Sequence, residues 1–282
     1  SINLTMTSDN DVSGAGSITL TSAPLSVNGG TITLNSNGQS VTQSGSIGGD
    51  ETINSSNGAV SIGVLDGDTA GTRSLTVNAG TATFTTTGAI GATNKLNNLT
   101  ISADDVALGA NVAGGGTLTI QPTSTTQGMK LGGAYTGTNA GYLTLSTTEI
   151  GYLVDGWSGI NIGKSGGLGG YMDVAASTWY DPVNFRGWYD RIRSMITGQG
   201  NASVSFTGSG AEFHAGGITT QGQNILVTPT AAIYGSNITM NSNGGNITLS
   251  ANIVGATASI GTFAVSSSGG NISLSGIVAG TT

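Results

Sequence analysis

A short segment that occurs twice near the C-terminal end restricts the fold of this chain more than any other feature. Residues 244–250 read Gly-Gly-Asn-Ile-Thr-Leu-Ser, and residues 269–275, 25 positions later, read Gly-Gly-Asn-Ile-Ser-Leu-Ser. Each copy alternates polar and apolar residues, which places Ile and Leu on one face of a strand and Asn, Thr and Ser on the other. Related alternating runs occupy residues 16–20, 29–34, 74–77 and 115–120.

These strands are too short to form stable hairpins on their own. Self-similarity with a period of 20–50 residues is typical of stacked repeats, in which neighbouring coils share one continuous apolar column. Each inward Ile, Leu or Val then contributes about 1.5–3 kcal/mol when it is fully buried. Gly and Asn suit the corners, because both tolerate positive φ. We therefore expect an all-β, parallel β-solenoid with roughly a dozen coils of about 20–25 residues.

The competing all-β folds are a sandwich and a barrel built from hairpins. Both need two-residue turns that join longer strands. Here Gly-Gly precedes strands far more often than Asn-Gly joins two of them, so the pattern favours the solenoid.

Composition excludes several function classes. Seven Lys and Arg residues and a net charge of −7 leave no cationic surface for nucleic acid. No run approaches the ~18 apolar residues of a membrane span, so we expect no membrane insertion. Cys is absent, which removes disulfides and thiolate metal sites. The apolar fraction of 37 % argues against disorder. Neither end resembles a cap or a signal peptide, so we expect a piece of a longer protein.

Five segments carry a family resemblance that covers most of the chain and is best between about 74 and 280. They are residues 94–101, 143–146, 181–183, 196–204 and 218–225. In their order the chain resembles the repeat regions of filamentous haemagglutinin-like proteins, giant adhesins exported by two-partner secretion. The resemblance implies a right-handed β-helix, an extracellular or bacterial cell-surface location, and adhesive or structural work. It implies no catalytic residues.

The region 135–189 breaks the regular pattern, because it holds all three Trp and six of the seven Tyr. Ser146-Thr147-Thr148-Glu149 has the form of a capping box, which predicts a short helix over 147–155 with Gly156 after its end. We expect one continuous solenoid with a helical and aromatic-rich interruption around 146–193. Its parts are regular coils over 1–134, interrupted coils over 135–199 and regular coils over 200–282.

The aromatic and basic residues of the segment 171–193 allow two interpretations. On a protruding loop they could stack on sugar rings or anchor a protein. In the other interpretation they form a local cluster that covers a widened coil or the helix. An Arg–carboxylate pair within the loop, for example Asp190 with Arg193, would be an ordinary surface ion pair. The candidate contact residues are Trp179, Tyr180, Phe185, Arg186, Trp188, Tyr189, Arg191 and Arg193.

Catalysis is not expected. A polysaccharide-cleaving β-helix needs carboxylates that converge on one groove, whereas the acidic pairs here are spread along the chain. Neighbours on a strand, such as Asp50 and Glu51, also point to opposite faces. The sequence around His214 offers no Ser and Asp with a spacing that predicts a catalytic triad. We expect no cofactor; the one metal alternative is Ca²⁺ at residues 9–14, which begin like an EF-hand loop but lack its final Glu.

Two function classes remain, with ice binding a minor third because the outward Thr residues do not form even ranks. The first is a structural stalk or filament segment of a large bacterial surface or secreted fibre, with copies of itself as partners. The second is an adhesin module that binds a glycan or a protein, of a host or a neighbouring cell, through the segment 171–193.

Overall fold

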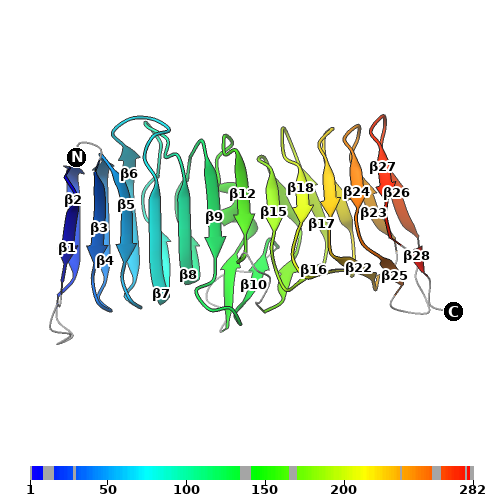
Figure 1. Ribbon diagram of the computed structural model, residues 1–282, viewed down its shortest axis with the longest axis horizontal. Helices are drawn as coiled ribbons and strands as arrows, with labels where there is room; N and C mark the ends of the chain where they lie inside the picture. The colour runs from blue at the N-terminus through cyan, green and yellow to red at the C-terminus, as the bar shows by residue number, and fades with distance from the viewer. Residues whose placement is uncertain are drawn as a thin grey trace. The chain divides into compact units, whose positions relative to one another are not determined.

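The alternating runs form parallel strands that stack coil upon coil, as the computed structural model in Figure 1 shows. The chain is an all-β, right-handed parallel β-solenoid of about 11 turns, with one short helix among the described residues. This confirms the predicted fold class. The structure describes residues 2–8, 16–27, 30–133, 141–164, 170–235, 237–255, 262–276 and 278–279.

The chain divides into two compact units. The first comprises the described residues within Ser1–Ser124, Gly137–Thr144 and Tyr152–Ser158. The second comprises those within Thr125–Thr136, Leu145–Gly151 and Gly159–Thr282.

In the first unit each coil contributes to two ladders of parallel strands, drawn blue to green in Figure 1. One ladder contains β1 (Leu4–Thr7), β3 (Thr31–Asn35), β5 (Asp50–Asn54), β7 (Leu75–Thr86), β8 (Leu99–Leu108) and β9 (Thr117–Gln121). The other contains β2 (Ile18–Leu25), β4 (Val41–Ile47) and β6 (Val60–Gly67), and then continues into β7 and β8. Strand β7 belongs to both ladders, because its first half pairs with β5 and its second half with β6.

In the second unit each coil gives one strand to each of three ladders. The first is β12 (Gly159–Ile162), β15 (Val183–Phe185), β18 (Val204–Phe206), β21 (Ile225–Val227), β24 (Ile247–Leu249) and β27 (Ile272–Leu274). The second is β10 (Gly128–Leu131), β13 (Met172–Val174), β16 (Tyr189–Ile192), β19 (Gly210–Phe213), β22 (Thr230–Ile233), β25 (Ile253–Gly255) and β28 (Val278–Ala279). The third is β14 (Ser177–Trp179), β17 (Met195–Gly198), β20 (Gly217–Thr219), β23 (Ile238–Asn241) and β26 (Phe263–Ser266).

The core is a set of apolar columns that the strand registers keep aligned. In β18 the first and last residues, Val204 and Phe206, are buried, and Ser205 between them faces outward. Val204 pairs with Ile225, which pairs with Ile247, and all three side chains are buried. The coil length varies around this fixed pairing: Leu99 and its partner Leu118 are 19 positions apart, whereas Ile247 and Ile272 are 25 apart. The extra residues of the longer coils lie in the corners between strands, not in the strands.

The repeated Gly-Gly-Asn segment is explained by the corner that it builds. Gly244 has a φ of 123° and Gly269 a φ of 136°, which other residues rarely adopt. The second glycine has no room for a side chain: a Cβ at Gly270 would lie 2.0 Å from the carbonyl oxygen of Gly245. The Asn side chain then joins the coils, because Asn246 Oδ1 accepts the backbone N–H of Asn271 at 2.9 Å. Each residue of the segment therefore has a structural role.

The predicted helix is present but shorter than expected. Helix α1 covers Thr147–Gly151, and Glu149 Oε2 accepts hydrogen bonds from the backbone N–H and the hydroxyl of Ser146, both at 2.8 Å. The capping box is thus confirmed, while the extension to 155 is wrong. The helix stops because residues after it return to strand pairing: the carbonyl of Tyr152 accepts the N–H of Val112 at 2.8 Å.

Candidate ligand-binding groove

Of the eight sequence-predicted contact residues, two are buried, two are half-buried (Arg186 and Arg191) and four are exposed (Tyr180, Trp188, Tyr189 and Arg193). Trp179 and Phe185 are fully buried, and their rings meet edge to face with centroids 5.7 Å apart. Phe185 also stacks on Phe206 at 4.9 Å. Both residues lie on short strands, not on a protruding loop, because their side chains point inward with the strand alternation. Trp179 and Phe185 are therefore core residues.

The exposed aromatic residues gather at one place, the beginning of β16. Trp188 and Tyr189 are 45 % and 37 % exposed, and their ring centroids are 5.6 Å apart. Tyr171, just before β13, joins them at 6.4 Å from Trp188 and 6.1 Å from Tyr189. We call Tyr171, Trp188 and Tyr189 the aromatic cluster. Tyr180 is also exposed, but it does not line the groove described below.

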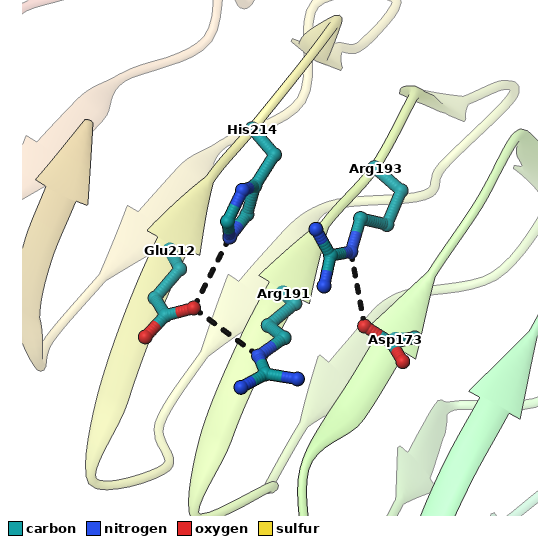
Figure 2. A network of polar contacts seen from close by, with 5 residues as sticks. All are labelled: Asp173, Arg191, Arg193, Glu212 and His214. Atoms are coloured by element: carbon teal, nitrogen blue, oxygen red, sulfur yellow. Dashed lines mark hydrogen bonds and ion pairs between the residues drawn. The ribbon is translucent and has the colours of Figure 1, made fainter. Parts of the chain in front are cut away.

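A row of charged side chains lies on the outer face of β13, β16 and β19 (Figure 2). The strand register places Asp173, Arg191 and Glu212 directly opposite one another. Arg191 donates to Glu212 across 3.2 Å, and its guanidinium carbon lies 3.3 Å from the ring centroid of Tyr171. The cation therefore connects the charged row to the aromatic cluster.

The other two charged groups complete this network, as Figure 2 shows. Arg193 pairs with Asp173 at 3.0 Å, and His214 Nε2 lies 3.1 Å from Glu212 Oε2. The predicted pairing of Asp190 with Arg193 is wrong. Asp190 occupies an inward position of β16 and is fully buried, because alternate residues of the strand face the core.

A groove of about 660 Å³ lies next to the cluster, with aromatic walls and a floor of small residues. Tyr189 pairs with Gly210, which pairs with Thr230, so small residues follow the aromatic ring in the next two coils. In the same way Glu212 pairs with Ala232, so a small residue follows the charged side chain in the next coil. At the far side, the ring of Tyr234 stacks on His214 with centroids 4.8 Å apart and planes 3° apart. The residues lining the groove are Tyr171, Trp188, Tyr189, Ser209, Gly210, Ala211, Glu212, Thr230, Ala232 and Tyr234.

Gly210 sets the depth of the groove. A Cβ at this position would lie 2.5 Å from the nearest atom of the Tyr189 ring, so the ring rests directly on the glycine backbone. The absence of a side chain lets Tyr189 lean over β19 and form one wall.

Sequence reasoning missed Glu212, His214, Thr230, Ala232 and Tyr234, which lie outside the segment 171–193. A signal for them exists in the coil repeat: Tyr189, Gly210 and Thr230 follow at intervals of about one coil. This signal alone does not pair the residues, because the coils differ in length.

A buried carboxylate shapes the turn that presents Trp188. Asp190 Oδ1 accepts the backbone N–H of Gly187 at 2.9 Å, which closes the turn from 187 to 190. Its Oδ2 makes no hydrogen bond within the part of the chain that the structure describes. Burial raises the pKa of Asp190 to about 7, and the hydrogen bond from Gly187 acts in the opposite direction.

A second buried carboxylate lies in the core of the first unit. Glu51 faces inward on β5 and accepts a hydrogen bond from Gln43 Nε2 at 2.9 Å, whereas its neighbour Asp50 faces outward. Burial raises the pKa of Glu51 to about 7, and the bond from Gln43 lowers it by less. The Oε1 atoms of both Glu51 and Gln43 have no hydrogen-bond partner among the described residues. A proton on Glu51 would give this pair the donor that it lacks.

Stability is expected to fall as the pH rises from about 4.5 to about 7, because the folded state keeps the proton of Glu51 while the unfolded state releases it. The loss attributable to this group is about 3 kcal/mol and is complete above pH 7. Glu51→Gln should therefore be more stable than the native chain at pH 8 and should differ little at pH 4. Urea unfolding at both pH values measures this, with Asp50→Asn as the exposed control. An equal pH dependence in Glu51→Gln and the native chain would contradict the assignment.

No group of three or more His, Asp or Glu side chains among the described residues is placed to hold a metal ion. The residues 9–14 that suggested Ca²⁺ lie outside the described residues. The helix that the structure describes is too short to cross a membrane.

Comparison with known proteins gives no match: neither a family model, nor a curated protein, nor a solved structure is significantly similar to this chain.

Proposed function

We propose that the chain is a structural segment of a large secreted or cell-surface fibre, in which the solenoid supplies length and stiffness. The observation that carries this proposal is the parallel pairing of successive coils, which repeats in register through each unit. A fold of this kind grows by adding coils without changing its cross-section, since each coil contacts only its neighbours. That property suits a stalk.

The resemblance to filamentous haemagglutinin-like repeats agrees with this role and adds the expected location, the bacterial cell surface. The proposal assigns the chain no catalytic activity and no cofactor. The residues that line the groove support this. Glycoside hydrolysis needs two carboxyl groups on either side of the scissile bond, and Glu212 is the one Asp or Glu among the described residues that line the groove.

Electron microscopy of the native material tests the structural role. Antibodies raised against the purified chain, coupled to gold, should label long, thin rods at the surface of the producing cells or in the medium. Antibodies absorbed with the purified chain are the control. Label confined to the cell interior, or to compact particles, would contradict the proposal.

A second candidate function is adhesion through the groove. The observation that favours it is the exposed aromatic cluster, since exposed Trp and Tyr side chains in a hollow surface are typical of contact sites. Stalk and contact site are compatible, because the exposed aromatic residues of the groove point outward and leave the core columns unchanged.

A further inference from the structure

Four successive coils each contribute residues to the groove. Tyr171 comes from the coil of β13, Trp188 and Tyr189 from that of β16, Gly210 and Glu212 from that of β19, and Thr230, Ala232 and Tyr234 from that of β22. Adjacent parallel strands are about 4.8 Å apart, so three steps extend the groove about 14 Å along the axis. An elongated ligand that lies along the axis fits this shape.

Four of the residues that line the groove are aromatic: Tyr171, Trp188, Tyr189 and Tyr234. The Tyr171 and Tyr189 rings are tilted by 43° to each other, and Trp188 is tilted by 65° to Tyr189. Such rings offer apolar faces together with polar edges, and the hydroxyl of Thr230 and the carboxylate of Glu212 lie on the groove lining. Ligands that alternate apolar C–H faces with hydroxyl groups match this surface.

The charges around the groove are already matched to one another. Arg191 is paired with Glu212, and Arg193 with Asp173. The network leaves no uncompensated cation for a polyanion, and the chain as a whole carries a net charge of −7. An uncharged ligand is therefore favoured over a sulfated or carboxylated one.

A peptide that binds by strand addition needs an open strand edge. Here the groove lies on the face of a sheet whose strands are paired on both sides: β19 pairs with β16 and with β22. The backbone hydrogen-bonding groups are used in these ladders. Recognition must then depend on outward side chains, which again suits a sugar chain.

We propose that the groove binds an extended, uncharged oligosaccharide, about three pyranose units long, that lies parallel to the solenoid axis. This inference rests on the adhesive function proposed above and names its ligand class. The sugars stack on the aromatic cluster and on Tyr234, and their hydroxyl groups bond to Glu212 and Thr230. The small side chains of Gly210 and Ala232 leave room for the rings between the walls.

The tryptophans of the chain give a direct measurement. Trp188 is 45 % exposed, while Trp157 and Trp179 are both 1 % exposed, so acrylamide quenching of the native chain reports on Trp188. The probes are mannotriose, cellotriose, xylotriose and tri-N-acetylchitotriose, all β-1,4-linked and uncharged. We expect at least one of them to protect Trp188 from quenching in a saturable manner. Trimannuronate, in which a carboxylate replaces the C6 hydroxymethyl group of each sugar of mannotriose, should protect it at least about tenfold less well.

Matched variants locate the site. Calorimetry with the best trisaccharide should show binding at least about tenfold weaker for Trp188→Ala, which removes a wall of the groove, and for Ala232→Phe, which fills its floor. Tyr180→Ala and Ser205→Phe change exposed or outward positions elsewhere in the same unit and should leave the affinity unchanged. Circular dichroism of all four variants should match the native spectrum, so a loss of binding is separated from a loss of fold.

Three results would overturn the inference. They are protection of Trp188 by none of the four neutral trisaccharides, preference for trimannuronate, and equal effects of Trp188→Ala and Tyr180→Ala on affinity. Each leaves the stalk proposal in place, because that proposal depends on the electron microscopy and not on sugar binding.

Discussion

Replacing Ile247 with Asp is expected to unfold several coils of the second unit at once. The side chain of Ile247 is completely buried, between Ile225 and Ile272 in the neighbouring coils. The substitution removes an apolar contact on both sides and places an ionisable group in the column. We expect a loss of about 4 kcal/mol in the free energy of unfolding. Since coils are stabilised by their neighbours, the damage should spread beyond one strand.

Thermal melting and amide hydrogen exchange measure this effect. The control is Thr248→Asp, which adds the same charge one position along the strand on the outward face. Its stability should stay within about 0.5 kcal/mol of the native chain. If both variants melt alike, the inward columns do not carry the stability that we assign to them.

A methyl group at Gly114 is expected to be almost as damaging, although the position has an ordinary φ. The Trp157 ring lies against the glycine, and a Cβ there would come within 2.1 Å of ring atoms. Trp157 is buried and its Nε1 donates to the carbonyl of Val112 at 3.4 Å, so the ring has little freedom to move. We expect Gly114→Ala to destabilise the first unit by about 3 kcal/mol.

The adjacent residue provides the matched comparison. A Cβ at Gly115 meets nothing within 4 Å, so Gly115→Ala should be neutral or slightly stabilising. Urea unfolding followed by tryptophan fluorescence compares the two variants. Equal stabilities would mean that the Trp157 ring moves aside without cost, contrary to this account.

The sequence predicted what depends on local alternation and missed what depends on coil length. The inward positions of Ile247 and Leu249 follow from the two-residue period of a strand. The Ser146–Glu149 capping box follows from a spacing of about one helical turn. Phe185 and Tyr189 were treated alike because both are aromatic, yet one faces the core and the other the groove. Their positions relative to the strand alternation decide this, and strands of three or four residues give too little pattern to fix it.

The charged network illustrates the same limit. Arg191 and Glu212 are 21 positions apart, and only the register of β16 with β19 brings them together. That register depends on how many residues each corner takes up, which varies from coil to coil. Local sequence can supply the candidates, but it cannot supply the pairing.

The direction of the strand pairing determines how each unit responds to tension. The ladder hydrogen bonds run along the stacking direction, since paired strands belong to successive coils. A pull on the chain along that direction loads the bonds of the outermost coil first, and coils behind it keep their partners. Each coil that peels away releases a segment such as the 21 residues between Val183 and Val204, about 70 Å of extended chain. Each unit therefore lengthens in small steps under load, and the coils that remain folded keep their outer faces intact.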